Sequence, residues 1–265
     1  MSAEEAGTVE VVRDGAVATV TLVRPAKHNA VTPQLDGAMA AAFAELARDD
    51  AVRVVVITGA GDEAFCTGAD ISTLLPVLRT RVATSDDPID FCGLSHRHPL
   101  PGKPIVAAVN GLALGGGFEL ALASDLRIAS TAARFGLPEP RWGLIPAAGG
   151  CARVLHALAP AVAAEVLLAG RRLDAEEALR WGLVSRVVEP PALRGTAAAI
   201  AQRMAETPLP AMRGLVDFWR AQRARQDEAA LREERALFEA LVASPETEAG
   251  IARFLARRPQ GGAAR

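Results

Sequence analysis

The sequence predicts a protein of the α/β class, and three features of the chain lead to this prediction. First, short apolar runs rich in β-branched residues occur at 52–58, 104–110 and 126–129, a pattern typical of strands buried in a parallel sheet. Second, segments of helical character lie between such runs, which is the alternation that α/β folds show. Third, the chain beyond about residue 200 contains only helical segments, rich in Ala and Arg with interleaved acids.

The N-terminal elements are a predicted hairpin and a predicted helix. Residues 9–23 have strand character on both sides of Asp14-Gly15, which is a hairpin turn signal. Thr32 followed by proline indicates a helix start, with Thr32 as the N-cap. We expect this helix to extend over 33–48.

The middle of the chain combines a glycine-rich helix with a loop. We expect a helix over 112–123, entered through three consecutive glycines at 115–117. Residues 136–140 contain one glycine and two prolines, which predicts a loop. The segment 151–158 after it has helical character.

The C-terminal part is predicted to be a separate helical region. Residues 184–188 form the last predicted strand. We place a boundary near residue 200, with an α/β core over 1–200 and a helical region over 201–265. Helices are expected over 209–225, 228–242 and 246–257.

The charged stretch 222–235 could suggest a nucleic-acid-binding patch. Its bases are matched by nearby acids, so we expect a solvated or subunit-facing helix instead. These acids are Asp227, Glu228, Glu233 and Glu234.

Composition excludes several classes of protein. The 265 residues are 50% hydrophobic with a net charge of -2, which argues against a disordered chain and against binding of nucleic acid. Three widely spaced cysteines without a CxxC pair suggest neither a zinc site nor a disulfide framework, and they favour a cytoplasmic location. Residues 1–7 do not resemble a signal peptide, and no run of 18 apolar residues indicates a membrane span. Without any tyrosine, acid–base chemistry must rely on other side chains.

Three segments have features that a mere scaffold does not need. Residues 65–70 place Gly68 directly after a short apolar segment, where backbone can approach a ligand, although a tight turn with Asp70 as a helix cap is the alternative. Residues 110–119 place three glycines at a helix start, which makes sense if backbone N–H groups must face an anion. Glu119 lies one turn into this helix, where it could instead only complement the helix dipole.

The third segment, residues 135–139, places Glu139 between two prolines in an apolar loop. An acid there has few local partners. A salt bridge or a helix cap is the alternative to a functional role.

Together these segments resemble the enoyl-CoA hydratase/isomerase family, also called the crotonase superfamily. The resemblance extends over nearly the whole chain, through residues 24–30, 54–59, 68–70, 108–119, 135–150, 177–188 and 250–258. It implies a crotonase-like spiral of ββα units followed by a helical region that forms trimers, often paired into hexamers. It also implies acyl-CoA thioester substrates, with coenzyme A present only as part of the substrate and no other cofactor.

The resemblance also implies roles for individual residues. Two backbone N–H groups stabilise the enolate at the thioester carbonyl in this family, and they map onto Ala69 and Gly116. In the hydratases two glutamates flank the α and β carbons of the substrate, and Glu119 and Glu139 occupy the matching positions, 20 residues apart. Retention of both acids favours reversible syn hydration of a 2-enoyl-CoA. Glu119 would deprotonate the water that attacks Cβ, and Glu139 would exchange the proton at Cα.

The coenzyme A end of the site is less sharply marked. The family pattern implies backbone contacts around the adenine near 26–29 and 68–71, and Lys27 and His28 could meet a phosphate group. Trp142 is expected to help wall the acyl pocket. For Lys27, an ordinary surface lysine is the alternative, and no metal site is expected at His96 and His98 because no companion ligands are evident. The expected substrate-binding residues are Ala26, Lys27, His28, Asn29, Gly68, Asp70, Ile71, Gly115 and Trp142.

Two departures from the family pattern leave other functions open. Ala147-Ala148 stands where the hydratases often have Gly-Ala, and the segment 72–102, which shapes acyl-chain access in the family, cannot be folded from sequence. An isomerase, dehydratase, decarboxylase or hydrolase acting on CoA esters is therefore an alternative to the hydratase. A non-catalytic acyl-CoA-binding protein on the same fold is another.

Overall fold

The computed structural model describes residues 3–85, 89–95 and 98–256. The expectations for His96 and for residues 1–2 and 257–265 lie outside these ranges.

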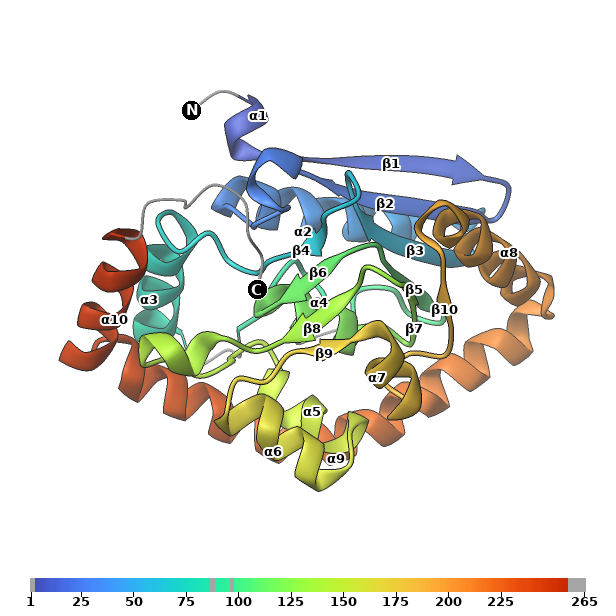
Figure 1. The fold of residues 1–265 in the computed structure, drawn as a ribbon. Coiled ribbons are helices and arrows are strands. Elements are labelled where there is room, and N and C mark those ends of the chain that lie inside the picture. Colours follow the sequence, from blue (N-terminus) through green and yellow to red (C-terminus); the bar gives the residue numbers. More distant parts are fainter. Residues whose placement is uncertain (1–2, 86–88, 96–97, 257–265) are drawn as a thin grey trace.

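Two sheets form the centre of the fold (Figure 1). The larger sheet has the strand order β1-β2-β3-β5-β7-β10 and the smaller one β4-β6-β8-β9. Neighbouring strands are parallel, except for the antiparallel pairs β1–β2 and β8–β9. The strands are β1 (Thr8–Asp14), β2 (Val17–Val23), β3 (Val54–Gly59), β4 (Ala64–Cys66), β5 (Ile105–Val109), β6 (Leu112–Leu114), β7 (Leu126–Ser130), β8 (Arg134–Gly136), β9 (Leu173–Asp174) and β10 (Val187–Val188).

Helices surround these sheets. The α-helices are α1 (Ala3–Ala6), α2 (Pro33–Arg48), α3 (Leu74–Thr84), α4 (Gly116–Ala123), α5 (Gly150–Ala157), α6 (Pro160–Leu168), α7 (Ala175–Arg180), α8 (Leu193–Glu206), α9 (Leu209–Val242) and α10 (Pro245–Ala256). The described residues also form the short 3-10 helices η1 (Pro25–Lys27), η2 (Glu139–Trp142) and η3 (Pro190–Ala192). None of the helices within the described ranges is both long and apolar enough to cross a membrane.

A unit of two strands and a helix recurs along the chain. The units are β3-β4-α3, β5-β6-α4 and β7-β8-α5, with η2 between β8 and α5 in the last. In each unit the first strand joins the larger sheet and the second joins the smaller one. This arrangement confirms the predicted α/β class and the expected succession of ββα units.

The N-terminal predictions are confirmed in detail. β1 pairs with β2 with Asp14 opposite Val17, and Gly15 in the turn has φ +58°. α2 begins at Pro33, and the side chain of Thr32 accepts a hydrogen bond from the Leu35 N–H at 3.1 Å. The hairpin turn and the helix cap were predicted correctly because each depends on neighbouring residues in the sequence, and tertiary contacts do not override them.

Other predicted elements differ from the structure. Leu112–Leu114 is a strand between β4 and β8, and the helix begins only at Gly116, because Gly115 has φ +54° and breaks the helical path. The two helices expected between 209 and 242 form the single helix α9, which has no proline or glycine at the supposed junction. Of the strand expected at 184–188, only Val187–Val188 forms the strand β10, although Ser185 and Arg186 also form backbone hydrogen bonds with β7.

The C-terminal helices pack on the core in two ways. α8 lies on one face of the larger sheet, where Leu193, Ala197 and Ala201 contact valines of the sheet, among them Val54 and Val106. Residue 200, at the predicted boundary, therefore lies inside a helix that packs on the sheet. α9 extends along the lower edge of the molecule, past α5 and α6, and leads into α10 beside α3 (Figure 1).

Candidate active site

The predicted functional segments meet at one edge of the smaller sheet. β4, β6 and β8 are parallel neighbours, so their carboxyl ends lie side by side. Gly68 and Ala69 follow β4, Gly115 and Gly116 follow β6, and Glu139 follows β8. Segments that are far apart in sequence are thus brought together by the sheet itself.

The loops after β4 and β6 touch through glycine. Gly68 has φ +90°, and a Cβ atom there would lie 2.9 Å from the Gly116 nitrogen. The Gly68 carbonyl accepts from the Val31 N–H and the Asp70 N–H donates to the Val31 carbonyl, each at 2.8 Å. These two bonds hold the loop from one side, so the N–H of Ala69 between them faces the other way.

The N–H groups of Ala69 and Gly116 are available as donors. Within the described part of the chain, neither of them donates a hydrogen bond to another protein group. Gly116 is the first residue of α4, where N–H groups have no partner inside the helix and the helix dipole is positive. Two such donors can stabilise a developing oxyanion.

Glu119 is buried in the first turn of α4, with 3% of the residue exposed. Its Oε1 atom accepts hydrogen bonds from the N–H groups of Ala148 at 2.7 Å and Gly150 at 2.8 Å. Burial and the nearby charges of Glu139 and Glu234 raise the pKa of Glu119 well above its usual range, against the effect of the two N–H donors. A side chain that merely complements the helix dipole would not need this enclosed site.

Glu139 is the first residue of η2 and lies against the glycine run. Gly115 has φ +54°, which disfavours other residues, and a Cβ atom on it would lie 2.7 Å from the Glu139 Oε1 atom, so the glutamate lies directly against this glycine. Its Oε2 atom is buried and has no hydrogen-bond partner among the described residues. Burial, together with the charge of Glu234, raises the pKa of Glu139 to about 7. Neither the salt bridge nor the helix cap considered as an alternative is found in the described ranges.

The hydrogen bonds indicate how the two glutamates differ. The two N–H donors on Glu119 stabilise its ionised form. The buried Oε2 of Glu139 lacks a donor, which favours its protonated form. Both pKa values are raised, so either carboxyl can exchange a proton near neutral pH, and the hydrogen bonds favour Glu119 as the base and Glu139 as the acid.

The structure adds a third buried acid, Glu234 on α9, which sequence reasoning placed on a solvated or subunit-facing helix. This interpretation is wrong for part of the segment, because Asp227, Glu234 and Arg235 are buried against the core of the same chain. Glu234 accepts hydrogen bonds from the N–H groups of Gly149 and Ala152. The signal that could have found it is its position on an apolar face, four residues before the buried Phe238.

The expected coenzyme A segment near η1 is largely exposed. Ala26, Lys27 and His28 lie on the surface, and the His28 Nε2 atom lies 3.0 Å from a Glu63 carboxylate oxygen. Asn29 is different because it is fully buried: its Oδ1 accepts from a backbone N–H, and its Nδ2 donates to two backbone carbonyls. The Asn29 side chain therefore holds the loop in shape.

Asp70 also supports its loop. Its carboxylate lies 2.8 Å from Arg24 Nη1 and accepts from the N–H and hydroxyl of Ser72. Burial would raise the pKa of Asp70, but the hydrogen bonds of Ser72 and the charge of Arg24 outweigh this effect and lower it. Asp70 does not cap α3, which begins four residues later.

Ile71 and Trp142 lie near α10. Ile71 lines a cavity of about 360 Å³ between α3 and α10. The Trp142 ring packs on the Phe254 ring at 4.9 Å, and a Cβ on Gly250 would collide with the Trp142 carbonyl oxygen. α10 thus covers this side of the site, and Trp142 contacts it directly.

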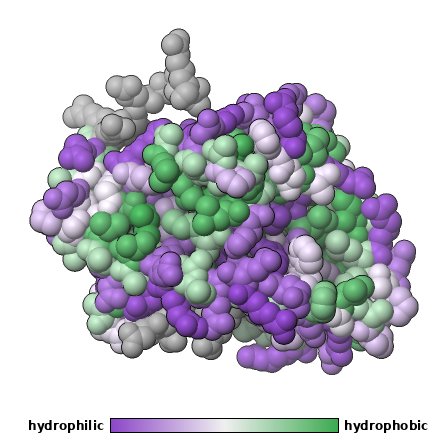
Figure 2. Space-filling view, turned by 90° about the horizontal axis from the view of Figure 1, so that it is seen from below, coloured by the Kyte–Doolittle hydropathy of each residue, from purple (hydrophilic) through white to green (hydrophobic). Residues whose placement is uncertain are grey.

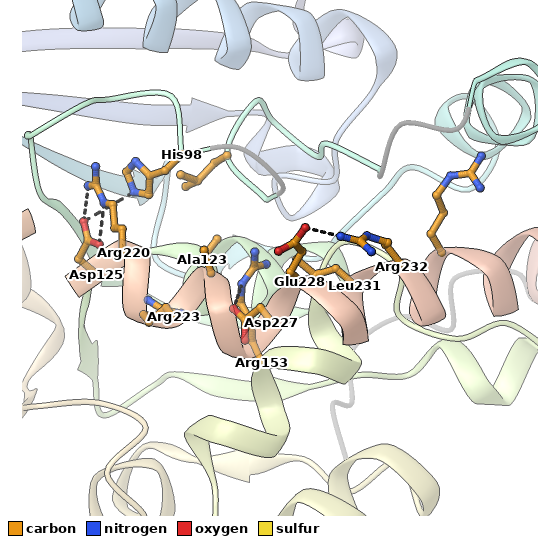
Figure 3. Close-up of a pocket in the computed structure, with 13 residues that line it drawn as sticks. His98, Ala123, Asp125, Arg153, Arg220, Arg223, Asp227, Glu228, Leu231 and Arg232 are labelled. Atoms are coloured by element: carbon orange, nitrogen blue, oxygen red, sulfur yellow. Dashed lines mark hydrogen bonds and ion pairs between the residues drawn. The ribbon is translucent and has the colours of Figure 1, made fainter. Parts of the chain in front are cut away.

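A second cavity, of about 580 Å³, lies between α9 and the core (Figure 3). Arg220 of α9 reaches across it to Asp125 at 2.6 Å. His98 lies beside this pair, and burial lowers the pKa of its imidazole to about 3 despite the Asp125 charge. No group of three potential metal ligands is found in the part of the chain that the structure describes.

Comparisons with known proteins show what this chain is similar to. The profile of the enoyl-CoA hydratase/isomerase family matches residues 13–261. A carnitinyl-CoA dehydratase of Citrobacter koseri is 40% identical over 210 residues, which is 79% of this chain and 78% of the relative. The structure of a carnitinyl-CoA dehydratase from Mycobacterium avium superposes with a TM-score of 0.81 at 34% identity, covering 94% of this chain and 97% of the other. An enoyl-CoA hydratase from Mycobacterium tuberculosis gives a TM-score of 0.78 at 33% identity, covering 89% and 99%.

Proposed function

Because the chain belongs to the enoyl-CoA hydratase/isomerase family of crotonase-type enzymes, which act on CoA esters, we propose that it adds water reversibly to a 2-enoyl-CoA thioester. One observation carries this proposal. Two glutamates, the buried Glu119 and the partly buried Glu139, meet at the same sheet edge as the unpaired N–H groups of Ala69 and Gly116. A protein that only binds acyl-CoA has no evident need for two acids with raised pKa values beside its donors.

The two N–H groups act on the thioester carbonyl. Addition of water to Cβ moves negative charge onto the carbonyl oxygen of the resulting enolate. Donors fixed by Gly68 and by the start of α4 are already oriented toward this charge, so little reorganisation is needed. Removing one such donor from an enzyme typically costs about 3–4 kcal/mol of transition-state stabilisation.

The two glutamates exchange the protons. Glu119 accepts a proton from water while the water oxygen bonds to Cβ, and the π electrons move into the enolate. Glu139 then donates its proton to Cα as the enolate collapses to the thioester. One proton has moved from Glu139 to the product and one from water to Glu119, and return of the latter to Glu139 through solvent restores the enzyme.

The reverse reaction, loss of water from a 3-hydroxyacyl-CoA, uses the same groups. The relatives named carnitinyl-CoA dehydratase favour this direction for at least some members of the family. A dehydratase and a hydratase need the same acid and base, so the direction depends on the substrate supplied. Isomerase, decarboxylase, hydrolase and pure binding functions are the competing outcomes.

The test is turnover of a panel of CoA esters followed by mass spectrometry. The panel contains 2-enoyl-CoA and 3-hydroxyacyl-CoA esters of several chain lengths, with carnitinyl-CoA among them. We expect at least one ester to gain or lose water, and the activity to fall about 10²–10⁴-fold in Glu119→Gln and in Glu139→Gln. Binding of the esters by calorimetry without any turnover would instead support a non-catalytic acyl-CoA-binding protein.

We propose further that the protein works in the cytoplasm as a homotrimer or a pair of trimers. Viewed from below, the surface carries apolar patches separated by hydrophilic side chains (Figure 2). On α9, Leu215, Phe218 and Trp219 are 64%, 66% and 53% exposed and share one helical face. Burial of this face against other subunits would explain why it is apolar. Sedimentation of the wild type and of Phe218→Ser compares their oligomeric states.

A further inference from the structure

The turn that leads into α5, together with the first residues of that helix, lies between two carboxylates. On one side, the carboxylate of Glu119 accepts hydrogen bonds from the N–H groups of Ala148 and Gly150. On the other side, Glu234 accepts two hydrogen bonds. Its Oε1 atom accepts from the Gly149 N–H at 2.6 Å, and its Oε2 atom accepts from the Ala152 N–H at 3.1 Å. Successive N–H groups of a single turn therefore alternate between the base of the proposed reaction and an acid from the C-terminal helix.

This alternation requires an unusual backbone. Gly149 has φ +95°, and a Cβ atom on it would collide with the guanidinium of Arg153. A Cβ on Gly150 would lie 2.8 Å from the Glu119 Oε1 atom. A turn built from two glycines is conformationally free in itself, so something outside the turn must fix it.

α9 supplies that support at two points. Asp227, seven residues before Glu234 and so on the same side of the helix, lies 3.5 Å from Arg153 Nε (Figure 3). Arg153 in turn donates to the carbonyl of Ala148 at 3.1 Å. Glu234 holds the N–H groups of the turn, while Arg153 holds a carbonyl of the same turn.

Glu234 only accepts hydrogen bonds from N–H groups of the turn, which favours its ionised form. N–H groups of the turn and the charge of Arg153 oppose the burial that raises the pKa of Glu234. With 2% of the residue exposed, Glu234 is shielded from water.

We propose that Glu234 is a positioning residue for Glu119: it fixes the turn 147–152 so that the N–H groups of Ala148 and Gly150 hold the carboxylate of Glu119 in its working orientation. This inference rests on the proposed function, in which Glu119 is the base. It also makes the C-terminal helix part of the site rather than only an oligomerisation element.

The test compares Glu234→Ala and Glu234→Gln with Glu228→Ala and Glu228→Gln. Glu228 lies on the same helix, but it is exposed and pairs with Arg232, so it is a matched control. In Glu234→Ala we expect kcat to fall about 10- to 100-fold with KM within about twofold, because the bound substrate is unaffected while the base is misplaced. Glu234→Gln retains one acceptor oxygen and should recover part of the loss. The control variants should keep wild-type kcat.

A second readout does not depend on activity. Hydrogen–deuterium exchange measured with single-residue resolution separates the N–H groups of Ala148 and Gly150, which Glu234 does not touch, from those of Gly149 and Ala152, which it does. The N–H groups of Ala148 and Gly150 should exchange faster in Glu234→Ala than in the wild type and at the wild-type rate in Glu228→Ala. Unchanged exchange, or faster exchange with kcat within twofold of the wild type, would overturn the proposal. If the wild type turns over no ester of the panel, the hydratase function fails, and the exchange measurement still decides whether Glu234 fixes the turn.

Discussion

Replacement of Glu139 by glutamine should make the protein more stable at alkaline pH while removing its activity. The pKa of Glu139 is raised from the ordinary 4.5 to about 7, chiefly by burial. A raised carboxyl pKa means that the folded state binds the proton more tightly than the unfolded state. The folded protein therefore loses stability as the pH rises from below 4.5 through 7, and above 7 the loss is complete.

The size of this effect follows from the two pKa values. The interval from 4.5 to about 7, at ~1.4 kcal/mol per pH unit, gives ~3 kcal/mol of destabilisation at high pH. Between pH 5 and pH 8 the wild type should lose about 2.5 kcal/mol that Glu139→Gln does not lose. The charge of Glu139 also raises the pKa of Glu119. Removing this charge in Glu139→Gln relieves the repulsion on Glu119 and therefore stabilises the variant at high pH in the same direction.

Urea unfolding followed by tryptophan fluorescence measures this difference, at one protein concentration and at several pH values. The variant Glu228→Gln, at an exposed position, should follow the wild type throughout. If the stability difference between Glu139→Gln and the wild type is the same at pH 5 and pH 8, Glu139 is not a buried acid with a raised pKa, and its assignment as the proton donor is refuted.

Three further predictions concern other parts of the molecule. Gly68→Ala should lower kcat about 10²–10³-fold, because a Cβ at this left-handed position meets the Gly116 nitrogen, and steady-state kinetics of a folded variant checks this. Arg220→Ala should lower the free energy of unfolding by about 3–5 kcal/mol, since it leaves buried Asp125 without its cation; urea midpoints near the wild-type value would contradict this. Thr32→Ala should cost about 0.5–2 kcal/mol through loss of the α2 cap, which thermal unfolding can detect.

The sequence predicted the fold where local signals and burial point in the same direction. The β-branched run that became β3 is buried at every position, so its apolar character indicated its location directly. The strand β6 was missed because Leu112–Leu114 is as compatible with a helix as with a strand. Only its pairing with β4 and β8 decides between them, and that pairing is a tertiary effect.

The site was predictable in part for the same reason. The glycine run and Glu119 lie in one segment, so their relation could be inferred from spacing together with the family resemblance. Glu234 lies 85 residues from the turn that it contacts, and its neighbours are mostly Arg and Glu. The local signal is the apolar face that Glu234 shares with Phe238, but its contact with the turn cannot be inferred until α9 is known to fold back over α5. Asn29 was identified from the family pattern, but the sequence did not indicate that its buried side chain holds the loop by hydrogen bonds to backbone carbonyls.

The central claim is that Glu119 and Glu139 exchange the protons of water addition at a CoA ester. The most direct measurement is mass spectrometry of enoyl-CoA and 3-hydroxyacyl-CoA esters incubated with the wild type, Glu119→Gln and Glu139→Gln. The account predicts gain or loss of water with the wild type and a rate lower by about 10²–10⁴-fold with each variant. Wild-type rates in both glutamine variants, or conversion of an ester without any gain or loss of water, would contradict it.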